Sequence, residues 1–217
     1  MSALTERPPS FDWTETLERL HAFAADRGAT LTPDERAFVS DDGVWRFEPP
    51  LVQSIAPGIT TPESYEVDIG SSLGLQLIVL VRAGAFAFGL WHDDDLWTHK
   101  AQKRYVVRGN GRAQPSHLAR KGKSRYGSRL RLRNAAAQHE DLASRLAAID
   151  AEHGRPRGLW LSCPTRLASD LHAAAGGLPW PRAAWQRIPH HVHEPDFAEV
   201  LRVRALLVRG HIRQLAP

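Results

Sequence analysis

A short loop, Gly109-Asn110-Gly111-Arg112-Ala113-Gln114, places one uncharged amide side chain inside a strongly basic part of the chain. A glutamine amide donates and accepts hydrogen bonds without titrating. The glycines allow backbone angles that other residues avoid and let the main chain approach a ligand closely. The Gly-x-Gly pattern lacks the further glycine and the helix of a dinucleotide-binding fingerprint. Spacing alone therefore favours a hairpin turn with a surface glutamine, and a chemical role needs support from other residues.

The segment around this loop carries a concentration of positive charge. Between Leu96 and His139 the chain has no Asp or Glu but twelve of its 28 Lys and Arg residues, so the rest has sixteen basic against 24 acidic residues. Such a run neutralises phosphates and releases their counterions, which gives affinity for nucleic acid without sequence specificity. Because Tyr105 and Tyr126 are the aromatic residues interleaved with these cations, we expect contact with the backbone of structured RNA rather than stacking on single strands.

Two other clusters have residue types that bind metals. His92-Asp93-Asp94-Asp95 contains hard ligands for a nuclease-type ion, but adjacent residues point in different directions, so a solvated hairpin turn is favoured. His190, His191 and His193 lack a well-spaced further ligand. The single cysteine, Cys163, excludes an intramolecular disulfide and a thiolate-rich zinc site, and it is best explained as a small core residue. We expect no metal and no cofactor.

The composition predicts a globular protein of one large domain, or one domain with an appendage. The chain has 217 residues, a formal charge of +4 and 42% hydrophobic residues, which is enough for a sizeable core. Residues 1–11 show no apolar signal region, and the longest apolar run, residues 75–81, is too short to span a bilayer. We therefore expect a cytoplasmic protein without a membrane partner, and a monomer.

Hydrophobic periodicity predicts a run of strands followed by alternating helices and strands. A helix over 11–27 has Asp12 as N-cap with Glu15 three residues on. Residues 29–62 are expected to be irregular with one edge strand near 44–47. Beyond them we expect strands at 75–81, 85–91, 96–99, 104–108, 158–163 and 185–188, a loop at 115–126, and helices at 128–153, 164–175 and 195–209. This order predicts an α/β (α+β) fold with a mixed β-sheet flanked by helices. The expected domains are an N-terminal helix with an irregular extension, 1–62, and a main domain, 63–217.

Three stretches, in order, carry a resemblance to a known family. They are His99-Lys100 with Lys103-Arg104-Tyr105-Val106-Val107-Arg108, Gly122-Lys123-Ser124 through Gly127-Ser128-Arg129-Leu130-Arg131, and Trp185-Gln186-Arg187-Ile188-Pro189 with Pro195-Asp196-Phe197-Ala198-Glu199-Val200-Leu201-Arg202-Val203. Together they span about residues 65–210 and resemble the Vms-like release factor domain, in its bacterial, actinobacterial-type form. Its relatives are similar to the middle domain of the eukaryotic peptide-chain release factor, which implies an RNase H-like architecture.

The resemblance implies a peptidyl-tRNA hydrolase of ribosome rescue. In that family a Gly-Gly-Gln or Gly-Ser-Gln loop enters the ribosomal peptidyl transferase centre, and the matching residue here is Gln114. Gly109, Gly111, Arg112 and Ala113 would form the rest of the catalytic loop, although Arg112 stands where the family has glycine. The implied partners are the large ribosomal subunit, its rRNA and peptidyl-tRNA. The residues expected to bind RNA are Lys100, Lys103, Arg104, Arg108, Arg120, Lys121, Lys123, Arg125, Arg129 and Arg131.

Three alternatives remain open at the level of sequence. The same fold could cleave the 3′ end of tRNA as an endonuclease. The Arg112 departure motivates a non-catalytic ribosome- or RNA-binding factor. A metal-dependent nuclease that uses Asp93 to Asp95 is the least favoured of the three.

Overall fold

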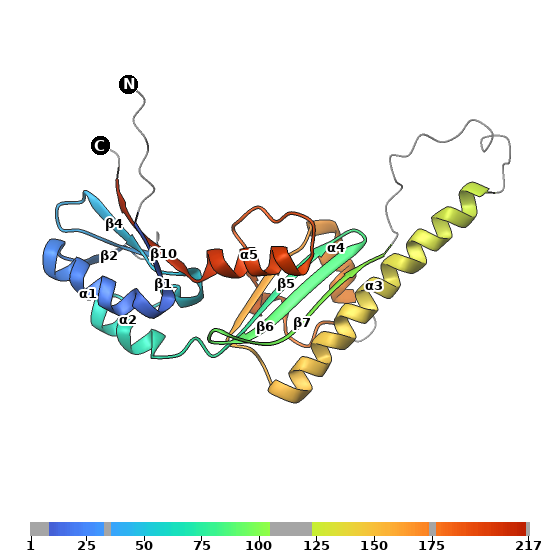
Figure 1. Cartoon of the computed structure of the whole chain (residues 1–217), viewed down its shortest axis with the longest axis horizontal. Helices are drawn as coiled ribbons and strands as arrows, with labels where there is room; N and C mark the ends of the chain where they lie inside the picture. The colour runs from blue at the N-terminus through green and yellow to red at the C-terminus, as the bar shows by residue number, and fades with distance from the viewer. Residues whose placement is uncertain (1–8, 33–35, 105–122, 174–176, 216–217) are drawn as a thin grey trace, which may run out of the picture. The chain divides into compact units, whose positions relative to one another are not determined.

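The computed structural model describes residues 9–32, 36–104, 123–173 and 177–215 (Figure 1). The chain divides into two compact units, one formed by residues 1–73 with 203–217 and the other by residues 74–202. Each unit has its own five-stranded sheet. These units divide after residues 73 and 202. The domain boundary that the sequence places between residues 62 and 63 stays a prediction.

The first unit is an antiparallel sheet in the order β1-β10-β4-β3-β2. Its strands are β1 (Ser10–Asp12), β2 (Thr30–Thr32), β3 (Ala37–Val39), β4 (Trp45–Glu48) and β10 (Arg209–Gln214). The strand expected near 44–47 is present as β4. The rest of 29–62 was expected to be irregular, which was wrong, as was the extension of the last helix to residue 209. Strands of three or four residues are too short to show a period of two, and β10 comes from the far end of the chain.

Two helices complete the first unit. The Asp12–Glu15 cap is confirmed, because the Asp12 carboxylate accepts from the Thr14 N–H and the Asp12 N–H donates to Glu15 Oε2 at 3.0 Å. A short 3₁₀ turn, Trp13–Glu15, follows this cap and leads into α1 (Thr16–Arg27). The second helix, α2 (Pro62–Ile69), was not predicted; its buried Tyr65 donates its hydroxyl to the Gln53 carbonyl at 2.7 Å.

The second unit is a mixed sheet in the order β7-β6-β5-β8-β9. Its strands are β5 (Leu75–Arg82), β6 (Ala85–His92), β7 (Asp95–Lys103), β8 (Gly158–Ser162) and β9 (Gln186–Arg187). The β5–β6 and β6–β7 pairs are antiparallel, whereas β5–β8 and β8–β9 are parallel. Four strands therefore end at one edge of this sheet, at Arg82, Lys103, Ser162 and Arg187, and we call it the carboxyl edge. The mixed sheet predicted from the sequence is confirmed.

Two crossover helices make the parallel pairings possible. They are α3 (Lys123–His153), between β7 and β8, and α4 (Thr165–Ala173), between β8 and β9. Leu142 and Leu146 of α3 are fully buried against alternate residues of β5, such as Leu77 and Val79. Because β5 is a central strand with helices on its face, its apolar run is nearly continuous, as the sequence predicted. A further helix, α5 (Phe197–Leu207), follows β9.

The N-terminal half of α3 continues past the carboxyl edge (Figure 1). Gln138 marks the point where the helix meets the sheet, because its amide donates to the carbonyls of Arg82 and Ala85 at 2.9 and 3.1 Å. At 1.5 Å per residue, the turns from Lys123 to Gln138 reach about 22 Å beyond this point. The predicted helix start at residue 128 was late, because a helical stretch that packs on no sheet needs no apolar stripe.

Candidate functional site at the carboxyl edge of the second sheet

The expected catalytic loop lies outside the described residues. Gly109, Gly111, Arg112, Ala113 and Gln114 all fall within 105–122, as do Arg108, Arg120 and Lys121. What the structure places are the two ends of that segment. β7 ends at Lys103 at the carboxyl edge, and α3 begins at Lys123 beyond the same edge. The segment is therefore attached at the carboxyl edge at one end and to the projecting half of α3 at the other.

The remaining residues expected to bind RNA divide into two groups. Lys123, Arg125, Arg129 and Arg131 are in the first turns of α3, where the backbone is described but the side chains are not. Lys100, Lys103 and Arg104 are at the end of β7 and are described fully. The sequence predicted a strand over 104–108, but Arg104 is not in a strand, because β7 ends at Lys103. The other four residues of that predicted strand lie outside the described part of the chain.

Lys100 and Lys103 project from opposite faces of β7. Lys100 is opposite the core residue Phe88 on β6, whereas Lys103 is opposite Ala85. Side chains of directly opposed residues share a face, and the face alternates along a strand. An RNA backbone that contacts both lysines must therefore wrap around this outer strand.

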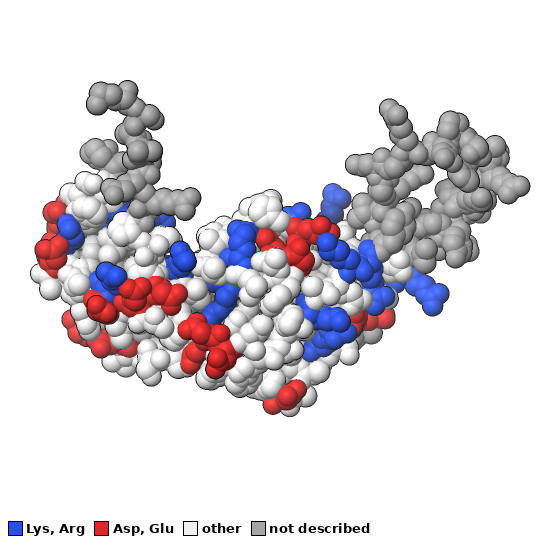
Figure 2. Space-filling view, in the orientation of Figure 1, with Lys and Arg blue, Asp and Glu red and all other residues white. Residues whose placement is uncertain are grey.

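Folding brings acidic side chains to the segment that has none in sequence. Lys103 Nζ is 3.0 Å from Glu194 Oε1, and Arg104 Nη2 is 3.6 Å from Asp141 Oδ2 on α3. Asp141 also accepts a bond from Arg145 at 2.9 Å. The Lys103–Glu194 pair is exposed, and exposed pairs contribute about 0–1 kcal/mol, so a phosphate can compete for Lys103. Figure 2 shows Lys and Arg side chains gathered over β7 and α3 in the view drawn.

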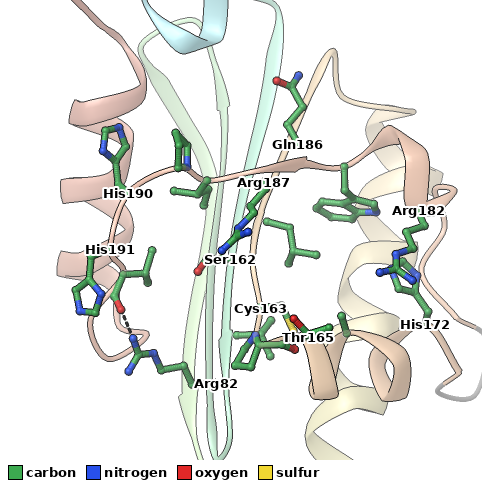
Figure 3. A pocket seen from close by; sticks show the side chains of 18 of the residues that line it. Arg82, Ser162, Cys163, Thr165, His172, Arg182, Gln186, Arg187, His190 and His191 are labelled. Carbon is green, nitrogen blue, oxygen red and sulfur yellow. Dashed lines mark hydrogen bonds between the residues drawn. The ribbon is translucent and has the colours of Figure 1, made fainter.

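A pocket with a volume of about 1190 Å³ opens at the same carboxyl edge. It is formed where β5, β8 and β9 end and α4 begins (Figure 3). Its lining includes Arg82, Ser162, Thr165, Arg182, Trp185 and Arg187, and we call it the arginine pocket. In Figure 3, Arg187 points toward Ser162, and Arg182 lies next to His172.

Burial sets the protonation of the titratable groups around the arginine pocket. Burial, and secondarily the Arg182 guanidinium, holds the pKa of His172 below its ordinary value. His190 also has a lowered pKa, first through burial and then through Arg202. Burial raises the pKa of Cys163 to about 11, so this thiol is protonated near pH 7 and is a poor nucleophile. Cys163 was expected in a core strand; it follows β8 instead and lines the pocket.

The two clusters of possible metal ligands have structural partners. At the β6–β7 turn, Asp93 has a φ of 51° and accepts a bond from the Gly74 N–H at 3.2 Å. The His193 N–H donates to Glu199 Oε1 at 2.6 Å. Within the described ranges, no three His, Cys, Asp or Glu side chains are grouped so as to hold a metal ion.

The arginine pocket was missed by reasoning from the sequence. Its lining comes from segments that are far apart in the sequence, and the one that belongs to a recognised motif, Trp185 to Pro189, was read there only as part of the family resemblance. One general rule pointed to it: in sheets with parallel strands, ligands bind beyond the carboxyl ends of the strands. Applying that rule requires the strand order, which the sequence did not provide.

Comparison with known proteins identifies the family. A solved structure described as the Vms1 mitochondrial localization core aligns with a TM-score of 0.54 at 9% sequence identity, covering 93% of this chain and 81% of that chain. At this identity the alignment supports the fold alone, the mixed α/β architecture expected from the resemblance. A search among curated proteins gave no match.

None of the helices in the described residues combines the length and apolar character needed to cross a membrane.

The model of a family described as Bacteroidetes VLRF1 release factor matches residues 76–215, close to the span on which the resemblance rests. That description names Bacteroidetes rather than the actinobacterial type suggested by the sequence motifs. Because the match covers more than half of the chain, this protein belongs to the VLRF1 release factor family.

Proposed function

We propose that this protein is a cytoplasmic, ribosome-dependent peptidyl-tRNA hydrolase that acts on stalled or obstructed large subunits. Gln114 positions the attacking water in the peptidyl transferase centre. The observation that carries the proposal is membership of a release factor family over residues 76–215, a span that includes the whole basic segment and its single loop glutamine.

The reaction is the attack of water on the ester that joins the nascent peptide to the terminal ribose of tRNA. Much of the surrounding active site is ribosomal RNA, so the protein needs to deliver only a group that orients water. A neutral amide does this at any physiological pH because it donates and accepts hydrogen bonds without titrating. Holding water beside the ester carbonyl is a proximity effect, to which nearby backbone N–H groups add stabilisation of the oxyanion.

The attachment of the loop supports this role. β7 ends at the carboxyl edge, and α3 begins at Lys123 beyond that edge, so both described ends of the loop's segment lie on one side of the second sheet. The five peptide units from Gly109 to Gln114 add a reach of about 17 Å when extended. Lys100, Lys103 and Arg104 stand at the start of the loop, and the positive end of the α3 dipole stands at its return. These charges are suited to the phosphates of tRNA and rRNA.

The deciding experiment measures release of labelled peptide from purified large subunits carrying peptidyl-tRNA. We expect Gln114→Ala to reduce the rate at least 100-fold, the scale of loss seen when a positioned catalytic group is removed. Gln214→Ala, an exposed glutamine on β10, is the matched control and should leave the rate unchanged. Sequencing the tRNA after reaction identifies the bond that breaks: an intact CCA end means ester hydrolysis, and a shortened end means endonuclease activity.

Arg112 favours one competing function, a ribosome-binding factor without catalysis, because it occupies a position where the family has glycine. In that case Gln114→Ala would release peptide as the wild type does. Neutralising Lys121, Lys123 and Arg125 would abolish sedimentation with large subunits. Arg112→Gly separates the two functions further, since it should raise the release rate only if the loop is catalytic.

A further inference from the structure

We propose that the arginine pocket is a binding site for a nucleoside phosphate. Arg82, Arg182 and Arg187 line the pocket from different sides and supply the positive charge that attracts the phosphate, and the indole of Trp185 with its apolar neighbours contacts the base and ribose. The inference goes beyond the proposed hydrolysis and does not depend on Gln114.

The first support is that the positive charge of the three arginines is not balanced by acidic side chains in the lining of the pocket. The three arginines come from three elements: the end of β5, the turn that follows Pro181, and β9. No Asp or Glu lines the pocket, and within the described residues none of the three guanidinium groups pairs with a carboxylate. Arg82 donates to the carbonyl of Val192, a neutral partner. By contrast, Lys103, Arg104 and Arg145 near the same edge all have acidic partners. The pocket thus keeps its positive charge for a ligand.

The second support is the composition and size of the cavity. Leu161, Trp185 and Ile188 line it beside the arginines. A volume of about 1190 Å³ is slightly above the usual range of about 300–1,000 Å³ for a small-molecule site and far exceeds that of a phosphate ion. A ligand that satisfies both halves of the lining therefore carries a flat or apolar part in addition to its anion, as a nucleoside phosphate does.

Packing holds the Trp185 ring in place for this contact. The ring lies edge-on to Trp180 with 5.7 Å between ring centroids, which fixes its orientation in the lining of the pocket.

The location fits an anion as well. The pocket lies beyond the carboxyl ends of the parallel strands β5, β8 and β9, where sheets of this kind bind ligands. Pro164 and Thr165, at the N-terminal end of α4, form part of its lining. The N–H groups and dipole of a helix start favour negative charge.

Isothermal titration of the full chain with AMP, adenosine, inorganic phosphate and penta-adenylate tests the proposal. We expect AMP to bind at least tenfold more tightly than adenosine or phosphate, because only AMP occupies both halves of the pocket. The double variant Arg182→Gln/Arg187→Gln should weaken AMP binding at least tenfold. Arg166→Gln, which removes an exposed arginine of α4 that does not line the pocket, should change binding less than twofold.

The titration with penta-adenylate shows whether the pocket binds a free nucleotide or an RNA strand. If penta-adenylate binds more tightly than AMP and loses affinity in the double variant, the ligand is an RNA strand; equal or weaker binding indicates a free nucleotide. Neutralising Lys121, Lys123 and Arg125 should leave AMP binding intact. The proposal is overturned if AMP and adenosine bind equally, if AMP does not bind, if Arg166→Gln has the same effect as the double variant, or if poly-glutamate competes with AMP at equal affinity. Unchanged circular dichroism of each variant confirms that it has folded.

Discussion

At the scale of single residues, the Glu199 carboxylate accepts three hydrogen bonds from two residues. They come from Arg202 Nε and Nη2 at 2.8 and 2.7 Å and from the His193 N–H at 2.6 Å. Arg202 also donates to the His191 carbonyl at 2.6 Å. These bonds, chiefly the one from Arg202, lower the pKa of Glu199 to about 2. One carboxylate thus fixes the chain between His191 and α5, which includes part of the motif that carried the family resemblance.

Glu199→Gln should destabilise the second unit by about 2–3 kcal/mol at pH 7, since a shift of one pKa unit corresponds to about 1.4 kcal/mol. The side chain is 7% exposed, so solvent screening is small. A folded pKa of about 2, below the ordinary 4.5, means that the carboxylate stabilises the fold above about pH 4.5 and loses this effect as the pH falls toward 2. The difference between variant and wild type should shrink over that range.

Urea denaturation at several pH values measures this difference, with hydrogen exchange assigning it to the second unit. Glu194→Gln is the matched control: Glu194 also pairs with a cation, Lys103, but its side chain is 67% exposed. The control should cost less than about 0.5 kcal/mol. Equal losses in the two variants would show that the Glu199 bonds do not hold the segment together.

Single residues were predicted well where their partners are close in sequence. Asp12 and Glu15 cap each other across three residues, and the capping pattern is visible in sequence. Arg182 and Arg187 gave no comparable indication, because their meaning depends on Arg82, a hundred residues earlier in the chain. The role of Gln114 stays a prediction, since it lies outside the described residues.

At the scale of elements, α3 has two halves with different surroundings. From Gln138 to His153 it packs on the sheet through Leu142, Leu146 and Ile149. The half before Gln138 extends past the carboxyl edge and leads from the basic segment. Gln138 is 2% exposed and joins the halves, because its amide bonds both carbonyls of the β5–β6 connection.

Gln138→Ala should lower the free energy of unfolding of the second unit by about 1–3 kcal/mol, because a buried carbonyl, that of Ala85, and the part-buried carbonyl of Arg82 lose their donor. It should also speed hydrogen exchange in α3 from residue 133 to 139, where the helix leaves the sheet. Gln102→Ala serves as the control, since the Gln102 side chain is part-exposed and forms no hydrogen bond within the described residues. Exchange that is unchanged around Gln138 would mean that packing alone anchors the helix.

Elements were predictable where a long apolar pattern faces a core. β5, β6 and the second half of α3 were identified correctly for this reason. β2 and β3 were not, because strands of three residues carry no readable period. β4 was predicted as an edge strand near 44–47, but it pairs with both β10 and β3. β9 has two residues and was predicted as four, because the flanking Trp185 and Ile188 are apolar; the Ile188 N–H still donates to the Leu161 carbonyl at 3.2 Å, just beyond the strand.

At the scale of the whole molecule, the first unit is built from both ends of the chain. β10 lies between β1 and β4 and pairs with both, through Phe11 with Gly210 and Phe47 with Ile212. Local patterns do not reveal such long-range pairing, which explains why the last helix was extended to residue 209 and no strand was predicted after it. The strands of the second unit, in contrast, all lie within residues 74–202.

This arrangement predicts that the C-terminal strand controls one unit only. A chain that ends at Val208 leaves the inner edges of β1 and β4 unpaired, and their buried N–H and C=O groups lose their partners. Gly210→Val tests the same strand in the full chain, because a Cβ at Gly210 would lie 2.2 Å from the Phe11 ring and 2.9 Å from the Glu48 carbonyl oxygen. Both changes should raise hydrogen exchange throughout residues 10–48 and leave β5, β6 and β8 protected. Gln214→Ala, at the exposed end of β10, should leave both units unchanged. Loss of protection in β5 and β6 as well would show that the two units fold as one.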